Sequence, residues 1–448
     1  MTGSTVAAER LLIRNVDIIT LDEAGRVLPG SQIAIAGGRI LAVGEAPPDF
    51  APTRTIDATD RVALPGFWNS HTHAPMAYIR GWADDISIER WFNERVWRIE
   101  SALAEQDVRW SAYLAAAEMI RGGTVGFADH YFFMDQVAQV VVESGLKANL
   151  AWAVFGEGSG AGMDPRLEQA VAFTRRWQGG AEGRIITWLG PHSPYLCDAA
   201  FLRRVAETAV DLDVGLHIHV AETPEQTQAS LAQHGLSPVA YLDSLGFFAQ
   251  PTIAAHCVGT DRADIEILAA RGVSVAQATG CYMKLGMGVP PLPQMLAAGV
   301  NVGLATDGQG SNNDLDLLQE AQLTSLLHKS HTRDATILPG DTVLRLATRG
   351  GARAMGFPES GVIAPGRPAD LILFDFRRPH LRPRHNLVSN LVYAAKSPDI
   401  SHVIVDGRLL LDEGRLTTLD EERILYEAER RAWNLAGREL HSLRAYVT

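Results

Sequence analysis

Cysteine is scarce in this sequence, and the few cysteines stand far apart. The 448 residues contain three of them, Cys197, Cys257 and Cys281. An odd number of widely spaced cysteines argues against a disulfide framework and fits a reducing compartment, so we expect a cytoplasmic protein. No two cysteines have the CxxC spacing, which argues against a zinc site built on thiolates.

Long apolar runs and clusters of basic residues are also missing. No apolar stretch reaches the roughly 18 residues that a membrane-spanning helix needs. The start, MTGSTVAAER, lacks the basic end and apolar core of a signal peptide. The net charge is −12, and no run is dense in Lys and Arg. Nucleic acids and anionic membranes require a basic face, so we expect neither as a partner.

What remains is typical of a globular protein. Hydrophobic residues make up 46% and charged residues 21% of the chain. A chain of this length exceeds one simple core and predicts one large domain with a smaller addition.

Both ends of the chain contain short strand-like runs separated by turns. Residues 10–65 alternate apolar and polar side chains, and the same texture returns in PADLILFDF and ISHVIVDGRLLLDEGRL. We expect antiparallel strands, with residues 1–65 and 361–448 combined into one small β-sandwich. The last stretch, from LDEERILYEAERR onward, has the periodicity and the acidic first turn of a helix.

The middle of the chain, residues 66–360, alternates short apolar runs with helical patterns. Such alternation implies parallel strands. The runs number eight, the number that closes a (β/α)8 barrel. They are VALPGFWNSH, TVGFADHY, KANLAWAVFG, RIITWLGPHS, VGLHIHVAET, TIAAHCVG, VSVAQATG and NVGLATDG.

Most of these runs end in polar, ionisable residues. In such barrels the chemistry lies at the carboxyl ends of the strands, so we expect the active site there. Residues two apart on a strand share a face, so His71 and His73 can point at the same ion. The polar strand ends are His71 and His73, Asp129 and His130, His192, His219 and Glu222, His256, and Asp307.

Three imidazoles and one carboxylate form a donor set that suits a divalent ion of the zinc type. His71, His73 and Asp307 supply three of these donors, and His219 or its neighbour His217 supplies the remaining imidazole. A pair of histidines alone is a weak signal, and the prediction depends on the further donors at other strand ends.

Seven motifs connect the sequence to a known family. LPGFWNSHTHAPM, RGWADD, WFNERVWRIE, GPHSPYLC, HIHVAET, AAHCV and TDGQGSNND occur in this order over nearly the whole chain. With them the sequence resembles the amidohydrolase superfamily. It is most similar to the cytosolic aminohydrolases that include methylthioadenosine/S-adenosylhomocysteine deaminases and s-triazine hydrolases.

The resemblance implies a role for several of these residues. His71, His73, His219 and Asp307 would hold one divalent metal ion per subunit, zinc or iron. His192 stands where two-metal members carry a lysine, which favours a single ion, and it would also contact the substrate. Glu222 would shuttle a proton and touch the substrate, and His256 would activate the attacking water.

The implied reaction is hydrolytic deamination of an aminated N-heterocycle. A metal ion lowers the pKa of its water from 15.7 to about 7 and makes hydroxide available at neutral pH. Glu222 would protonate a ring nitrogen, while Asp307 and His256 accept the proton of the water and return it to the leaving amine. An adenosine-type thioether nucleoside is the first candidate substrate.

Two residues bear on the choice of substrate. By resemblance, Glu100 would hydrogen-bond ribose hydroxyls, and Arg166 would bind the carboxylate of a homocysteine tail. The companion arginine expected near the end of the third strand is missing, because Val154 stands there. Glu157 follows nearby and would repel a carboxylate.

Residues 277–288, QATGCYMKLGMG, depart from the pattern of the group. The group shows His-Asn-Pro-x-Ser-Asn before MKLG, and this segment is expected to line the pocket. Two alternatives therefore stand beside the deaminase: a hydrolase that displaces chloride or an alkylamine from a triazine- or pterin-like ring, and a non-catalytic scaffold. Members of the group often form dimers or tetramers, so the resemblance also implies a homo-oligomer.

Overall fold

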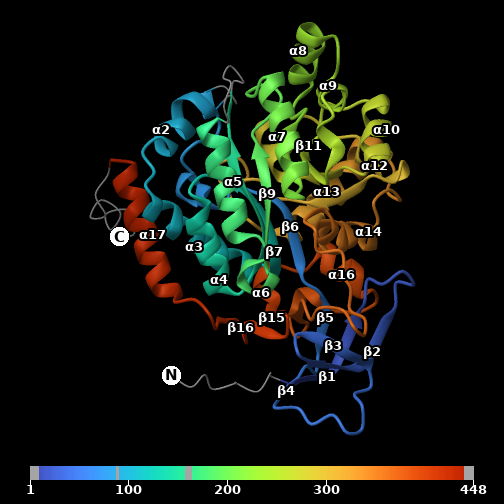
Figure 1. Cartoon of the computed structure of the whole chain (residues 1–448). Helices are drawn as coiled ribbons and strands as arrows, with labels where there is room; N and C mark the ends of the chain where they lie inside the picture. The colour runs from blue at the N-terminus through green and yellow to red at the C-terminus, as the bar shows by residue number, and fades with distance from the viewer. Residues whose placement is uncertain (1–9, 87–89, 157–163, 438–448) are drawn as a thin grey trace.

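The computed structural model of the chain describes residues 10–86, 90–156 and 164–437. A barrel of parallel strands wrapped by helices forms the larger part, and a smaller sheet built from both ends of the chain lies below it (Figure 1).

The barrel contains the eight strands that the sequence predicts. Each is hydrogen-bonded to the next in parallel, in the order of the sequence. The first and last strands also meet, because Ser70 Oγ donates to Leu304 O at 2.8 Å and Asn69 Nδ2 to Thr306 Oγ1 at 2.7 Å. The strands are β6 (Phe67–Thr72), β7 (Thr124–Tyr131), β8 (Lys147–Val154), β9 (Ile185–Pro191), β10 (Leu216–Val220), β11 (Thr252–His256), β12 (Ser274–Gln277) and β13 (Asn301–Leu304).

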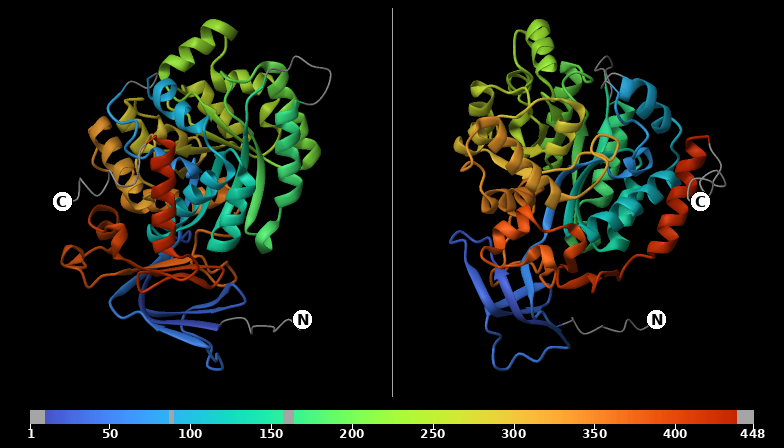
Figure 2. Two further views of the ribbon diagram at one scale, coloured as in Figure 1. Left: turned by 90° about the vertical axis from the view of Figure 1, so that its left-hand side faces the viewer. Right: turned by 180° about the vertical axis from the view of Figure 1, so that it is seen from behind.

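Helices follow the strands and cover the outside of the barrel (Figure 2). The α-helices are α2 (Trp97–Glu100), α3 (Glu105–Arg121), α4 (Met134–Ser144), α5 (Pro165–Trp177), α6 (Gly180–Gly183), α7 (Ala199–Leu212), α8 (Pro224–His234), α9 (Pro238–Ser244), α10 (Arg262–Arg271), α11 (Thr279–Leu285), α12 (Leu292–Ala297), α13 (Leu317–Thr332), α14 (Gly340–Arg345), α15 (Gly351–Ala354), α16 (Leu387–Tyr393) and α17 (Glu421–Leu435). Short 3-10 or π turns are η1 (Ala74–Ile79), η2 (Trp91–Val96), η3 (Phe247–Ala249), η4 (Leu346–Gly350), η5 (Pro379–Leu381) and η6 (Ser397–Asp399).

The two ends of the chain form one sheet of nine strands with a hydrophobic core of its own. Its order is β17-β16-β15-β14-β5-β1-β2-β3, with β4 also paired to β1. The strands are β1 (Arg10–Ile19), β2 (Val27–Ala36), β3 (Arg39–Gly44), β4 (Arg54–Asp57), β5 (Arg61–Pro65), β14 (Leu371–Asp375), β15 (Ile400–Val405), β16 (Arg408–Asp412) and β17 (Arg415–Leu416). The antiparallel pair β5–β14 joins the two ends, as the sequence predicts.

The expected purely antiparallel pairing is wrong for part of this sheet. β1 pairs in parallel with both β4 and β5, so the sheet is mixed. A hairpin motif in the sequence reveals only neighbouring strands, whereas these two pairs join strands that are separated by β2 and β3.

The chain passes directly from the small sheet into the barrel at Gly66. β5 ends at Pro65 and β6 begins at Phe67. A Cβ atom on Gly66 would lie 2.2 Å from Val125 Cγ1, so only glycine allows β6 to approach β7 here. We propose domain boundaries near residues 65 and 360, because β5 and β14 lie on the sheet side of both points.

Residues at the lower end of the barrel tie it to the sheet. The buried Lys147 Nζ at the start of β8 donates to Asp370 at 2.8 and 3.0 Å and to Asp406 at 2.7 Å. The C-terminal helix α17, which the sequence predicts, runs along the barrel beside α3 (Figure 2), and Arg431 Nη1 pairs with Asp107 at 2.9 Å. None of the helices in these described ranges has the length and apolar character that crossing a membrane requires.

Candidate active site

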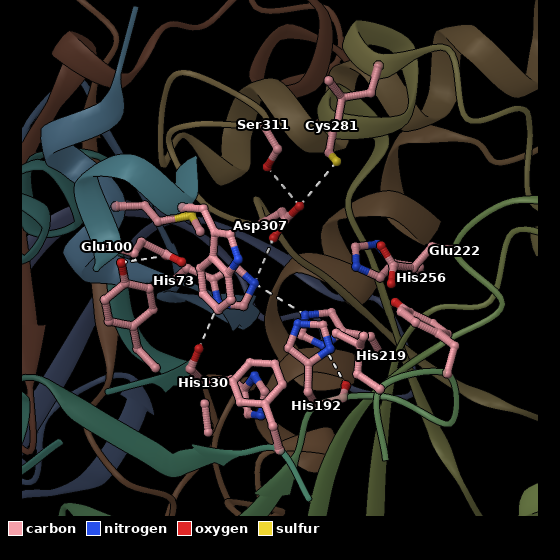
Figure 3. Close-up of a pocket in the computed structure, with 18 of the residues that line it drawn as sticks. His73, Glu100, His130, His192, His219, Glu222, His256, Cys281, Asp307 and Ser311 are labelled. Carbon is pink, nitrogen blue, oxygen red and sulfur yellow. Dashed lines mark hydrogen bonds and ion pairs between the residues drawn. The ribbon is translucent and has the colours of Figure 1, made fainter. Parts of the chain in front are cut away.

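A cavity of about 330 Å³ opens at the carboxyl ends of the barrel strands. Figure 3 shows its polar residues converging from several strands. The described lining residues are His73, Met76, Trp97, Glu100, His130, Tyr131, Phe132, Ala153, Phe155, His192, Tyr195, Leu196, His219, Glu222, Gln226, His256, Cys281, Leu285, Met287, Asp307 and Ser311.

Backbone carbonyls fix the orientation of two of the predicted ligand histidines. His73 Nδ1 donates to His130 O at 2.6 Å, and His219 Nδ1 donates to His192 O at 2.7 Å. In the neutral form of each ring Nε2 therefore carries the lone pair, and a ring held in this way is the usual form of a metal ligand.

The two lone pairs face each other, because His73 Nε2 and His219 Nε2 lie 3.2 Å apart. Two acceptors at this distance repel each other unless a proton or a metal ion lies between them. His71 Nε2 is also buried near this point and has no hydrogen-bond partner in the structure. The histidines thus fit a cation.

Asp307 completes the donor set. Its Oδ1 lies 3.2 Å from His73 Nε2 and 3.5 Å from His71 Nε2. Its Oδ2 accepts hydrogen bonds from Ser311 Oγ at 2.7 Å and from Cys281 Sγ at 3.1 Å, so the carboxylate is held from behind (Figure 3).

The structure brings the four predicted ligands together with His256, the predicted water-activating residue, in two overlapping groups. His71, His73 and His219 form one, and His71, His256 and Asp307 form the other, with all donor atoms of a group within 4.8 Å. His217, the alternative imidazole, belongs to neither group. Its Nε2 lies 2.8 Å from His71 Nδ1, so it supports His71 from below.

Burial keeps most of these imidazoles neutral, which is the form that binds metal. It lowers the pKa of His71 and His192 to about 3 and that of His256 to about 4. For His73, burial also lowers the pKa, but the hydrogen bond and charge of Asp307 outweigh burial and raise it to about 9. A positive charge is therefore favoured where His73 and Asp307 meet.

The backbone is strained at three positions of the site. Ala221, His256 and Asp307 have φ angles of +47°, +77° and +60°. Side chains other than glycine rarely adopt this left-handed region, and such strain concentrates at functional sites. At Asp307 a hydrogen bond from its N–H to His71 O, 3.1 Å long, holds the turn.

Glu222 lies in the same cavity and can exchange a proton at neutral pH. Burial, followed by the charge of Asp307, raises its pKa to about 7. Its backbone N–H donates to Gln226 Oε1 at 2.9 Å, which fixes the turn after β10. A carboxyl group with this pKa is suited to general acid–base work.

Glu100 and His192 lie on other walls of the cavity. Tyr131 OH donates to Glu100 Oε1 at 2.7 Å, and burial raises the pKa of Glu100. The ring of His192 stacks on Phe155 with centroids 4.8 Å apart. Both residues are placed to contact a bound molecule.

Arg166 is not part of the cavity lining in the described ranges. Its guanidinium binds Asp164 through Nε at 2.9 Å and Nη2 at 2.7 Å. Asp164 is the N-cap of α5 and also accepts from Arg166 N–H, so the arginine is held beside its own helix start.

The segment 277–282 contributes less to the cavity than expected. Of its residues only Cys281 lines the cavity. Tyr282 is buried, and its OH accepts from Ala278 N–H at 2.9 Å. The departure from the group's pattern therefore changes mainly the packing behind the wall.

The roles of three contributors to the site were not predicted. Ser311 orients Asp307, Tyr131 orients Glu100, and His130 supplies the carbonyl that binds His73. The polar ends of TVGFADHY and TDGQGSNND were the available signals, but neither specifies which side chain turns inward.

Histidines and an aspartate gathered at the carboxyl ends of a (β/α)8 barrel, beside a buried carboxyl group, are the site of a metal-dependent hydrolase. A model of the amidohydrolase family matches residues 62–410, so the chain belongs to this family, as its motifs indicate.

Individual relatives match over nearly the full length. The chain is 45% identical over 432 residues to a 5-methylthioadenosine/S-adenosylhomocysteine deaminase of Pelotomaculum thermopropionicum, covering 96% of this chain and 99% of that one. An adenosine deaminase from Xanthomonas campestris with bound zinc is 33% identical, with a TM-score of 0.91 over 95% of this chain and 98% of that one. A zinc complex of atrazine chlorohydrolase from Arthrobacter aurescens is 26% identical, with a TM-score of 0.87 over 94% and 100%.

Proposed function

We propose that this enzyme is a zinc-dependent deaminase of adenine nucleosides of the 5′-methylthioadenosine type. The observation that carries the proposal is the convergence of the Nε2 atoms of His73 and His219, 3.2 Å apart, with Asp307 Oδ1 in a cavity that also contains Glu222. The full-length likeness to a methylthioadenosine deaminase supports the substrate class.

His71, His73, His219 and Asp307 fit a single divalent ion. When bound, the ion supplies the Lewis acidity that brings the pKa of a water near neutrality. The bound zinc of the Xanthomonas relative supports zinc over iron. A scaffold without catalysis has no need of this donor set or of a buried carboxyl group beside it.

The side chains of this protein then move the protons. Water adds to the ring carbon that bears the amino group, and Glu222 gives its proton to the adjacent ring nitrogen. His256 and Asp307 accept a proton from the attacking water and pass it to the amino group. The C–N bond breaks and ammonia leaves, while the remaining proton of the former water returns to Glu222 and the ring keeps a carbonyl.

Two contacts orient the nucleoside in this proposal. Glu100, held by Tyr131, accepts hydrogen bonds from the ribose hydroxyls, and His192 contacts the base.

A homo-oligomer, dimer or tetramer, stays a prediction that light scattering on the purified protein checks.

Ammonia release is the test. Zinc-loaded protein is assayed with 5′-methylthioadenosine, adenosine, a pterin and atrazine, with chloride measured in parallel. We expect ammonia from the nucleosides, loss of activity with a chelator, and one zinc per chain. Chloride from atrazine without ammonia from any nucleoside would favour the triazine hydrolase instead.

A further inference from the structure

The lining of the cavity contains acidic side chains but no lysine or arginine in the described part of the chain. The acidic side chains are those of Glu100, Glu222 and Asp307. The two internal segments outside the described ranges, 87–89 and 157–163, contain neither lysine nor arginine in their sequence.

Two basic residues close to the cavity in sequence, Lys284 and Arg166, are bound to other groups. Lys284 lies in sequence between the lining residues Cys281 and Leu285. Its Nζ donates to Asp84 Oδ1 at 2.6 Å and to Gly310 O at 3.2 Å. Arg166 is bound on both sides of its guanidinium to Asp164. A carboxylate at the rim of the cavity would therefore meet no lysine or arginine of the lining, and burying an unpaired charge is costly.

The rim of the cavity is apolar and exposed. Trp97, Tyr195 and Leu196 line it and remain 46%, 43% and 44% exposed. Large apolar side chains held open to solvent at a cavity mouth mark a surface that a ligand covers. Phe132 and Phe155, with ring centroids 6.0 Å apart, continue this surface inward.

We infer that the enzyme selects adenine nucleosides by an uncharged, apolar 5′ group, accepts long apolar 5′-thioethers, and discriminates against the zwitterionic tail of S-adenosylhomocysteine. The inference rests on the proposed deaminase function and narrows it. The apolar rim covers the thioether, and a lining with acidic side chains but no lysine or arginine disfavours the carboxylate.

Two ligands of matched length isolate the effect of charge. 5′-Butylthioadenosine and S-adenosylhomocysteine have the same chain beyond the sulfur, except for the ammonium and carboxylate. Dissociation constants are measured calorimetrically with the zinc-loaded Glu222→Gln variant, which holds both ligands without converting them. We expect the butylthio compound to bind at least about tenfold more tightly, and kcat/KM of the wild type to follow the same order.

A substitution at the rim supplies the missing charge. Leu196→Arg should bring the ratio of the two dissociation constants down by about fivefold or more, whereas Leu196→Gln, which adds polarity without charge, should leave it near the wild-type value. Tyr195→Arg is the second variant if the first does not fold.

Binding decides this inference separately from turnover. Equal or tighter binding of S-adenosylhomocysteine, or no binding of the butylthio compound, would overturn it even if deamination is found. Selective binding of the butylthio compound without any ammonia release would support the selectivity and refute the deaminase.

Discussion

At the scale of single residues, Asp307 is held at both oxygens, which makes it sensitive to a minimal change. Oδ1 faces His71 and His73, while Oδ2 accepts from Ser311 and Cys281. In Asp307→Asn an amide nitrogen must replace one of these acceptors, so one set of partners is lost. We expect kcat/KM to fall by about 10²-fold or more and zinc content to drop. Steady-state kinetics and metal analysis check this. Asp243→Asn, which changes a partly exposed, ion-paired carboxylate outside the cavity lining, is the control.

Glu222 should respond differently from Asp307. It belongs to neither group of ligand atoms, and burial raises its pKa to about 7. Glu222→Gln removes the proton donor without touching the donor set, so we expect a rate loss of about 10²- to 10⁴-fold at unchanged zinc content. Loss of the metal from this variant would mean that Glu222 is a ligand.

The sequence was informative about residues whose side-chain orientation is set by their position at the end of a barrel strand. His71, His73, His219 and Asp307 stand at strand ends, and parallel strands of a barrel bring their carboxyl ends to one rim. It was less informative about Arg166, because the local competitor Asp164 binds its guanidinium. The pattern Asp164-Pro165 at a helix start signals such an N-cap.

At the scale of elements, the eight barrel strands were predictable because each is a short, largely buried run rich in apolar residues between helical patterns. The parallel pairing of β1 with β4 and β5 was not, since it joins strands that hydrophobic alternation alone does not pair.

The conformation of residues 277–282 also depends on a distant element. Glu320 of α13 accepts from Gly280 N–H at 3.1 Å through both oxygens, and a Cβ on Gly280 would lie 2.4 Å from Glu320 Oε1.

This contact between α13 and the start of α11 predicts how stability varies with pH. Burial raises the pKa of Glu320 from 4.5 to about 8. Between these values the unfolded chain releases the proton and the folded chain keeps it, so the free energy of unfolding falls as pH rises. Glu320→Gln has no such proton. From pH 5 to 8 its free energy of unfolding should therefore rise relative to that of the wild type by on the order of 4 kcal/mol, and its Tm should rise relative to the wild-type Tm.

Calorimetry of both proteins at pH 5, 6.5 and 8 measures this difference. The exposed Glu207 offers a matched control, because Glu207→Gln should change Tm equally little at each pH. Parallel Tm curves for the wild type and Glu320→Gln would show that Glu320 ionises normally in the folded protein.

At the scale of the whole molecule, one end of the barrel holds the candidate active site and the other end packs against the small sheet. The carboxyl ends of the strands hold the histidines, while the first residue of β8, Lys147, faces the small sheet. The sequence suggested that the two chain ends meet, and β5 pairs with β14. The ion cluster that joins sheet and barrel was not predictable, because Lys147, Asp370 and Asp406 are far apart in the sequence and carry no motif.

Removing the cation of this cluster should separate stability from activity. Lys147→Met leaves Asp370 buried, with only Ser360 Oγ at 2.8 Å and Asp406 N–H at 3.0 Å as partners. An uncompensated buried charge costs about 3–5 kcal/mol, whereas Arg262→Met, which breaks an exposed pair with Glu266, should cost less than about 1 kcal/mol. Because the cluster lies at the end opposite the cavity, kcat at 25 °C should stay near the wild-type value while the urea midpoint falls. Lys147→Met/Asp370→Leu, which removes the stranded charge as well, should recover part of the midpoint. A loss of kcat in folded Lys147→Met would instead mean that the sheet controls the geometry of the catalytic rim.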